Sequence, residues 1–243
     1  MAGTRIPLLL LPGLLCDGEL FAAQLSGLAG VADVRVADLT ARDTMAGLAS
    51  AALAHAPWPR FALGGLSMGG YVAYEILRQA PGRVLGLALM DTSARPDTPE
   101  GTANRRRLMA LAERDFPAVT ETLLPKLLLP AHAADARLAS IVRGMAERVG
   151  AAAFVRQQFA IIGRPDSRPG LAGIACPAIV IAGRDDALMP PEIHEEQAAG
   201  IRGAELVKIP DCGHLATIEQ PEAVSAALRG WLIAVAAAGR ASG

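Results

Sequence analysis

Residues 64–70 read GGLSMGG, so that four glycines surround a single hydroxyl, that of Ser67. The apolar run RFAL precedes this stretch, and the helical pattern SMGGYVAYEILRQA begins within it and ends before Pro81. Ser67 is therefore predicted to lie in a tight turn between a strand and a helix. The spacing Gly65-x-Ser67-x-Gly69 is that of the nucleophile elbow, in which a strained backbone exposes the serine hydroxyl. A Cβ atom two residues away on either side would clash in such a turn, which explains the glycines.

Two other glycine-rich loops fit this stretch less well. A phosphate-binding G-x-x-x-x-G-K loop requires a lysine, but its two possible registers place Gly70 or Tyr71 at that position. The dinucleotide motif G-x-G-x-x-G does not match the register. A chance serine in a glycine turn is the remaining alternative, and the strand-to-helix context favours the elbow over it.

Short apolar runs alternate with helical patterns along most of the chain. The runs show little polar alternation, as expected for parallel strands that are covered on both faces. This order predicts an α/β fold with a doubly wound, mostly parallel sheet of about six strands and a ligand site beyond their carboxyl ends. The predicted strands are residues 7–11, 31–37, 60–63, 84–90, 178–182 and 204–209. The predicted helices are residues 19–28, 45–54, 68–79, 191–199 and 221–236.

The segment from residue 95 to residue 168 breaks this alternation. It contains no convincing strand and reads as several helices, for example RRRLMALAERDF and AAAFVRQQFAIIG. A helical insertion between two strands predicts a cap over the strand tips. We therefore divide the chain into a core, formed by residues 1–94 and 169–243, and a helical cap formed by residues 95–168.

A serine becomes a strong nucleophile only when a neighbouring base takes its proton. His55 ends a predicted helix and His132 lies in the predicted cap. His194 begins HEEQA, which lacks the second histidine of the zinc motif H-E-x-x-H. His214 follows the last predicted strand, in a loop before the final helix, from which it could reach Ser67. We therefore select His214 as the base.

Three aspartates at strand tips are candidates for the acid that orients His214. Asp185 and Asp186 follow the run AIVIAG, and Asp91 follows VLGLALM. The chain order Ser, Asp, His results from either of the first two. The residues themselves leave this choice open.

These motifs resemble those of the α/β-hydrolase fold family, and the resemblance covers nearly the whole chain. LLLLPGLLCD is similar to the segment after the family's third strand, GLSMGG to its elbow, GRDDALMP to its acid loop and CGHLATIEQPE to its histidine loop. The resemblance implies a catalytic triad of Ser67, Asp186 and His214. It selects Asp186 over Asp185 because the acid loop has the spacing G-x-x-D-x-x-x-P.

The resemblance also implies an oxyanion hole formed by the backbone N–H groups of Leu14 and Met68. Two features depart from the family pattern. Pro12 stands where a histidine commonly precedes Gly13, which leaves the backbone donor in place but changes its support. The family's first two strands have no counterpart, so we expect an edge of the sheet that needs another cover.

Composition argues against several other classes of protein. The net charge of -1 and the aromatic content of 4% argue against a nucleic-acid surface. Cys16, Cys176 and Cys212 are widely spaced, which predicts neither disulfides nor a zinc site and fits a reducing compartment. The N-terminal leucines lack the flanks of a signal peptide, and no segment approaches the roughly 18 apolar residues of a membrane span. We expect a cytoplasmic protein without a membrane partner.

The predicted chemistry is hydrolysis of a small carboxylic ester through an acyl-enzyme on Ser67, with no metal or organic cofactor. The nearest alternative is a lactonase, such as one that opens the enol-lactone of 3-oxoadipate breakdown. The resemblance also admits carbon–carbon bond hydrolysis and cofactor-free haloperoxidase activity. A non-catalytic ligand-binding protein of the same fold would keep its ligand affinity without Ser67. The RRR cluster at residues 105–107 would suit a substrate carboxylate, although a solvated helix face is the simpler interpretation.

Overall fold

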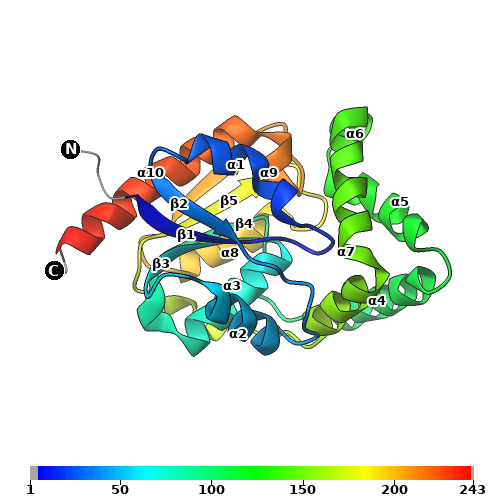
Figure 1. Cartoon of the computed structure of the whole chain (residues 1–243), viewed down its shortest axis with the longest axis horizontal. Helices are drawn as coiled ribbons and strands as arrows, with labels where there is room; N and C mark the ends of the chain where they lie inside the picture. Colours follow the sequence, from blue (N-terminus) through cyan, green and yellow to red (C-terminus); the bar gives the residue numbers. More distant parts are fainter. Residues whose placement is uncertain (1–4, 242–243) are drawn as a thin grey trace.

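One parallel β-sheet organises the fold, in a computed structural model that describes residues 5–241 (Figure 1). The strand order is β2-β1-β3-β4-β5-β6, and every neighbouring pair is parallel, which confirms the predicted doubly wound sheet of six strands. The direction of winding reverses between β1 and β3, so the loops that follow these two strands border the topological switch point, where such folds bind ligands. The strands are β1 (Ile6–Leu11), β2 (Ala32–Val36), β3 (Phe61–Leu66), β4 (Val84–Met90), β5 (Ala178–Gly183) and β6 (Glu205–Ile209).

Helices cover both faces of the sheet, and successive side chains of a strand enter different cores. Leu8 and Leu10 of β1 belong to the core under α1 and α10, whereas Leu9 and Leu11 belong to the core under α2 and α3. Burial on both faces explains why the strands are apolar throughout. The helices of the two faces are α1 (Ala22–Gly27), α2 (Met45–His55), α3 (Met68–Gln79), α8 (Pro191–Gly200), α9 (Ala216–Glu219) and α10 (Pro221–Ala241). Short 3-10 turns are η1 (Gly18–Phe21), η2 (Pro81–Arg83) and η3 (Arg168–Gly173).

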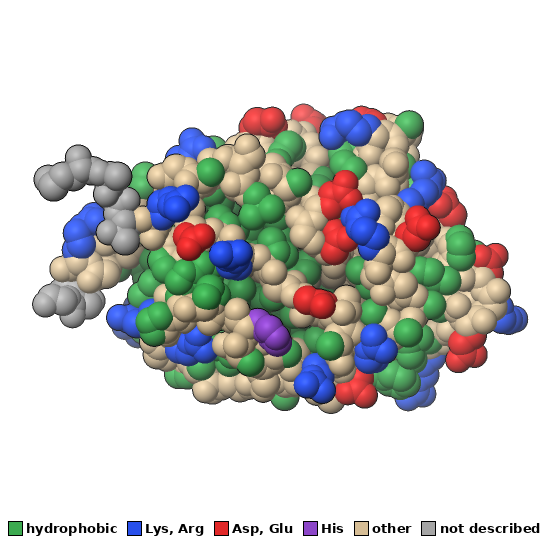
Figure 2. Space-filling model, in the orientation of Figure 1, with side chains coloured by type: hydrophobic (Ala, Val, Ile, Leu, Met, Phe, Trp, Pro, Cys, Tyr) green, Lys and Arg blue, Asp and Glu red, His purple; other side chains and the backbone are tan. Residues whose placement is uncertain are grey.

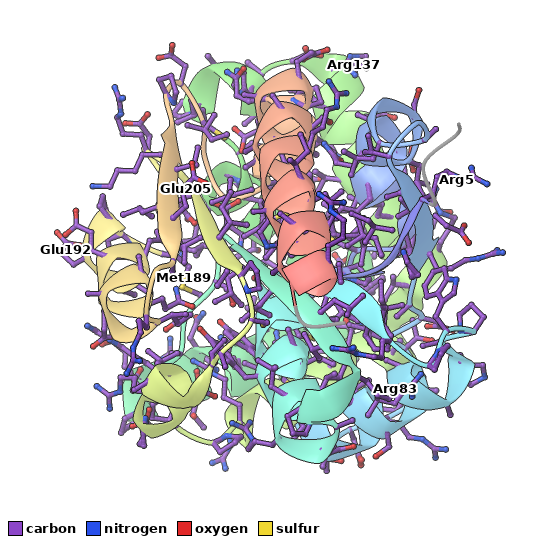
Figure 3. The ribbon with its side chains drawn as sticks, turned by 90° about the vertical axis from the view of Figure 1, so that its left-hand side faces the viewer. Arg5, Arg83, Arg137, Met189, Glu192 and Glu205 are labelled. Atoms are coloured by element: carbon purple, nitrogen blue, oxygen red, sulfur yellow. The ribbon has the colours of Figure 1, made fainter. Side chains whose placement is uncertain are left out.

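Helix α10 corrects one prediction. Its residues Pro221–Arg240 are long and apolar enough to cross a membrane by length and composition alone, although the sequence analysis predicts no such segment. A third of this stretch is buried, and the buried side chains include Val224 and Trp231, which belong to the core on one sheet face. Figure 3 shows α10 crossing in front of the sheet, with Glu205 of β6 on one side and Arg5 on the other. Packing on the sheet accounts for the buried apolar side chains of this helix, whereas Ile233 on its outer side is 63% exposed.

Four helices between β4 and β5 lie together at one end of the molecule (Figure 1). They lie within the segment 95–168, for which a cap is predicted. Three of them share a small apolar core that includes Leu108, Val119 and Phe154, and Leu15 from the loop after β1 packs into it. These helices are α4 (Pro99–Ala112), α5 (Phe116–Leu127), α6 (Pro130–Ala133) and α7 (Ala136–Ile162), and α7 bends at Gly150, where φ is 76°.

The third strand is longer than predicted. The sequence pattern predicts a strand that ends at residue 63 and glycines that lie in the turn, but β3 continues to Leu66. Gly64 and Gly65 pair with Ala88 and Leu89 of β4. An added Cβ at Gly64 would lie 2.8 Å from Leu10 Cδ2. Gly64 is therefore a strand residue that lets neighbouring side chains approach closely.

Acidic and basic side chains are interspersed over the face seen in Figure 2, with no large area of one sign. This distribution agrees with the net charge of -1.

Candidate active site

Ser67 lies between the end of β3 and the start of α3 and has a strained backbone, with φ 52° and ψ -116°. Two hydrogen bonds to the next strand region hold it there. Its own N–H donates to the carbonyl of Met90 at 2.9 Å, and the Thr92 hydroxyl donates to the Ser67 carbonyl at 2.7 Å. Because φ is positive at a non-glycine residue, this conformation persists only where the surroundings enforce it.

The glycines around Ser67 are required by backbone contacts. An added Cβ at Gly65 would lie 2.3 Å from the carbonyl oxygen of Gly69. An added Cβ at Gly69 would lie 2.0 Å from the carbonyl oxygen of Leu11 at the end of β1. Both obstacles are backbone atoms, which cannot turn away as a flexible side chain does. The elbow therefore fits against β1 only with glycine at these two positions.

Ser67, His214 and Asp186 form one chain of hydrogen bonds, although they come from three separate loops. His214 Nε2 lies 2.8 Å from Ser67 Oγ, and His214 Nδ1 lies 2.7 Å from Asp186 Oδ2. An ionised carboxylate can only accept hydrogen bonds. Nδ1 therefore carries the ring proton and donates a hydrogen bond to Asp186. Nε2 is then free to accept the hydroxyl proton of Ser67. His214 can therefore take the hydroxyl proton of Ser67 while Ser67 Oγ attacks an electrophile.

The charges of this group support a base at His214. Burial alone would lower the pKa of His214, but the Asp186 carboxylate outweighs it, and the pKa lies above its ordinary value. Burial alone would raise the pKa of Asp186, but the charge of His214 and their hydrogen bond hold it below its usual range. The backbone N–H groups of Leu188 and Met189 also donate to Asp186 Oδ1, at 2.8 and 3.0 Å. Asp186 is thus held ionised.

We expect kcat/KM for an ester to rise with pH through a midpoint above 6.5, the ordinary pKa of histidine. Protonated His214 cannot accept the Ser67 proton, so activity appears only as His214 loses its own proton. The measurement is the rate between pH 5 and pH 9, compared with an NMR titration of the His214 imidazole in the Ser67→Ala variant. A rate midpoint that differs from the His214 titration, or that lies below 6.5, contradicts this assignment.

Asp91, the competing aspartate, lies after β4 and points to the same region, but it has another partner. Its Oδ1 accepts a hydrogen bond from the Gly183 N–H at 2.7 Å, and its Oδ2 is buried with no partner among the described residues. Burial, reinforced by the charge of Asp186, raises the pKa of Asp91 well above its usual range. Asp185 is exposed. Of the three aspartates, Asp186 is the one that hydrogen-bonds to His214.

Three buried side chains near the triad could offer ligands to a metal ion. Asp91, Asp186 and His194 each place one potential ligand atom within 4.8 Å of the others. However, His194 Nε2 lies 2.9 Å from the Met189 carbonyl, and both oxygens of Asp186 already accept hydrogen bonds. A cation here would compete with His214 for Asp186, so the donor set fits hydrogen bonding better than metal binding.

The remaining candidates from the sequence are placed away from the reaction or are inert. His55 is exposed at the end of α2, with Nδ1 2.8 Å from the carbonyl of Ala51. Cys16 lines the same cavity as Ser67, but burial raises the pKa of its thiol to about 12. Because the thiolate is the reactive form of cysteine, Cys16 does not compete with Ser67 as a nucleophile.

His132 contacts an acid that the sequence analysis overlooks. Its Nδ1 lies 2.8 Å from Oε2 of Glu219, a buried residue of α9. The Glu219 carboxylate also accepts the N–H groups of Leu129 and Leu215, at 2.9 and 3.1 Å. Leu215 follows His214, so Glu219 connects the loop of His214 to α6 in the inserted helices.

The backbone N–H groups of Leu14 and Met68 are both available near Ser67. Met68 is the first residue of α3, where an N–H has no partner within its own helix. Leu14 and Ser67 line the same cavity. Among the described residues, neither N–H has a backbone acceptor. These two amides can receive a developing negative charge on a substrate oxygen.

Gln157 holds the loop that carries Leu14, a role that no sequence motif indicates. Its Oε1 accepts the N–H of Leu15 at 3.1 Å, and its Nε2 donates to the Leu39 carbonyl at 3.1 Å. Leu15 has a positive φ of 60°, so the loop needs such support. The only signal in the sequence is a pair of glutamines, residues 157 and 158, which follow Arg156 near the mostly apolar end of a helix.

A cavity of about 170 Å³ lies over the reactive group. It is smaller than the roughly 300–1,000 Å³ of common ligand pockets, which favours a small substrate. A larger cavity of about 550 Å³ lies elsewhere, between Arg78, Pro177 and Val235, and includes none of the triad residues. We take the smaller cavity as the candidate substrate site because Ser67 and His214 line it.

Comparisons with known proteins identify the family of the chain. A family model described as "Alpha/beta hydrolase family" matches residues 5–227. A thermophilic esterase from Thermogutta terrifontis, solved with malate bound, is 34% identical with a TM-score of 0.86, covering 96% of this chain and 92% of that one. An enol-lactonase from Burkholderia xenovorans LB400 is 24% identical with a TM-score of 0.86, covering 95% of this chain and 92% of that one. At that lower identity the likeness is one of fold alone.

A curated relative is also an esterase by name. The pimeloyl-[acyl-carrier protein] methyl ester esterase of Neisseria meningitidis serogroup C is 28% identical over 171 residues, which is 68% of this chain. The chain spans 66% of that relative's length, slightly less than two thirds. All three proteins are named for the hydrolysis of an ester or a lactone.

Proposed function

Since this chain belongs to the alpha/beta hydrolase family, we propose that it is a serine esterase that cleaves small carboxylic esters through an acyl-enzyme intermediate. The observation that carries the proposal is the hydrogen-bond chain from Asp186 through His214 to Ser67, which ends at a cavity that Ser67, His214 and Leu14 line. The sequence identity to a thermophilic esterase adds support.

In the first half of the proposed reaction, Ser67 Oγ attacks the ester carbonyl while His214 Nε2 takes its proton. The carbonyl oxygen becomes an oxyanion, which accepts hydrogen bonds from the Leu14 and Met68 N–H groups. Asp186 stabilises the imidazolium and keeps its Nδ1–H pointing away from the serine. His214 then gives its proton to the leaving alcohol, and the acyl group remains on Ser67.

In the second half, His214 takes a proton from a water molecule, which attacks the acyl carbon. The second oxyanion collapses, the acid leaves, and His214 returns the proton to Ser67. The residues present supply every proton transfer in this sequence. The proposed reaction therefore requires no organic cofactor or metal ion.

We propose that residues 95–168 act as a cap that selects the substrate, above a core of residues 1–94 and 169–243. Leu108, Leu123 and Ile161 of the inserted helices line the cavity opposite Ser67. These side chains favour a short acyl group whose methylenes pack against them. A tie between Glu219 and α6 would keep the cap close to the loop of His214.

We expect p-nitrophenyl acetate and butyrate to be hydrolysed at least about tenfold faster than the dodecanoate, as judged by kcat/KM. Extra methylenes forced into a filled site cost about 1–3 kcal/mol, and the cavity holds only about 170 Å³. A burst of p-nitrophenol, in proportion to enzyme, would mark the acyl-enzyme. Absence of hydrolysis of all three esters by the folded protein would contradict the esterase proposal.

A lactone can be opened by the same attack, so a lactone such as dihydrocoumarin belongs in the same assay. A lactone rate well above every ester rate would favour the lactonase alternative. A protein that only binds a ligand would show no burst and would keep its ligand affinity after Ser67→Ala. We also propose a reducing compartment such as the cytoplasm, because all three cysteines are free thiols.

A further inference from the structure

The cavity over Ser67 has an unbalanced charge. Two cationic side chains line it, Arg105 from α4 and Lys126 from α5, and no Asp or Glu of the described residues is among its lining. Lys126 is exposed at the rim, whereas the side chain of Arg105 is only 21% exposed. Of the RRR cluster, Arg105 lines the cavity, and Arg106 and Arg107 are exposed and do not line it. Arg105 is therefore the one arginine among the residues that line the cavity.

Arg105 is fixed in position and still has donors to offer. Its Nε–H donates to Asp97 Oδ1 at 3.2 Å, and its Nη1 donates to Gln158 Oε1 at 3.0 Å. A guanidinium has five N–H donors, so three remain without a partner among the described residues. Asp97 also pairs with Arg164 at 3.0 Å, so one carboxylate is shared by two guanidinium groups. Positive charge is left over on this side of the cavity.

Gln158 adds a second donor that lacks a partner. Its side chain is fully buried, yet its Nε2 has no hydrogen-bond partner among the described residues. The amide cannot be turned around, because Arg105 has only donors and must face the amide oxygen. A buried NH2 group without an acceptor costs about 1–3 kcal/mol, so an acceptor from a ligand would relieve this cost.

We propose that Arg105 and Gln158 form a carboxylate-binding subsite, so that the preferred substrates are half-esters of small dicarboxylic acids. Arg105 and Gln158 line the cavity that Ser67 also lines, and each has N–H donors without a partner among the described residues that an anionic acceptor would satisfy. Lys126 at the rim attracts the anion but does not fix it. This inference rests on the proposed esterase function, whose substrate class it specifies.

The test compares two esters that differ only at the far end of the acyl chain, monomethyl succinate and methyl butyrate. We expect the wild type to hydrolyse the succinate half-ester at least about tenfold more efficiently, as measured by kcat/KM. Arg105→Gln should lower kcat/KM for the half-ester by about 10–100-fold, because a charge-assisted hydrogen bond is lost, and should leave methyl butyrate nearly unchanged. Gln158→Leu should lower the half-ester rate to a smaller extent.

Arg106→Gln is the matched control, because this arginine is the exposed neighbour of Arg105 and does not line the cavity. It should leave both esters unchanged. Unimpaired hydrolysis of methyl butyrate by Arg105→Gln shows that the variant is folded. The subsite is excluded if the wild type treats the two esters alike, or if Arg105→Gln lowers both rates equally.

A binding measurement separates this inference from the esterase proposal. Calorimetric titration of monomethyl succinate into the Ser67→Ala variant needs no turnover, and we expect binding that weakens by about 10–100-fold when Arg105→Gln is added. If hydrolysis fails but this binding persists, the esterase proposal is wrong and the subsite stands. Affinity that does not depend on Arg105 would overturn the subsite, whatever the outcome for hydrolysis.

Discussion

Replacing Ser67 with alanine is expected to reduce kcat for ester hydrolysis by about 10⁶, because the atom that carries the acyl group is removed. The variant should remain folded, since the elbow is held by backbone hydrogen bonds and by the Thr92 contact to the Ser67 carbonyl. Steady-state kinetics with p-nitrophenyl butyrate measure the loss, and thermal unfolding checks the fold. His214→Ala should cost about as much, and the double variant little more than either, because the two side chains act as a unit.

Ser50→Ala is the matched control for this prediction. Ser50 is an exposed serine of α2 whose hydroxyl bonds Gln79, far from the cavity. Its rate should equal that of the wild type. If Ser67→Ala kept more than a small percentage of wild-type activity, then Ser67 would not be the nucleophile.

Asp186→Asn is expected to lower kcat by about 10⁴, because the amide cannot stabilise the imidazolium and no longer selects the tautomer with its proton on Nδ1. Asp91→Asn should change kcat by less than about tenfold. Burial raises the pKa of the Asp91 carboxyl well above its usual range, which favours the uncharged form that an amide resembles, and the amide keeps the acceptor for the Gly183 N–H. Both variants are measured with the same ester at the pH optimum.

Asp185→Asn is the control for the neighbouring position, because Asp185 is exposed and should tolerate the change. The assignment of the acid to Asp186 is wrong if Asp91→Asn is the more damaging of the two buried substitutions. Equal losses for Asp185→Asn and Asp186→Asn would point to a general effect of charge on the loop.

The elbow could be predicted from sequence because its motif is short and part of what it requires is local. The clash that excludes a Cβ at Gly65 involves Gly69, four residues away, so the motif itself records the contact. The strand ends were harder to predict, since glycines inside a strand and glycines in a turn look alike. Gly64 is a residue of β3, and it is a glycine because Leu10 of the neighbouring strand approaches it closely. A local sequence pattern cannot reveal that contact.

Residues of the cavity could not be predicted in the same way. Arg105 and Gln158 are 53 residues apart and meet only because α4 packs on α7. Gln157 and Leu15 are 142 residues apart, and their contact depends on how the inserted helices rest on the core. The strand pattern alone also could not decide between Asp91 and Asp186, because both follow strands. The hydrogen bond from His214 to Asp186 depends on how the two loops pack in the folded chain.

The central claim is that His214 activates Ser67 as a nucleophile, and labelling with a fluorophosphonate probe tests it most directly. The probe reacts with an activated serine whatever the natural substrate is. We predict one adduct per chain on the folded wild type, located at Ser67 by mass spectrometry, and its loss in His214→Ala. An unlabelled wild type, an adduct at another residue, or equally fast labelling of His214→Ala would contradict the claim.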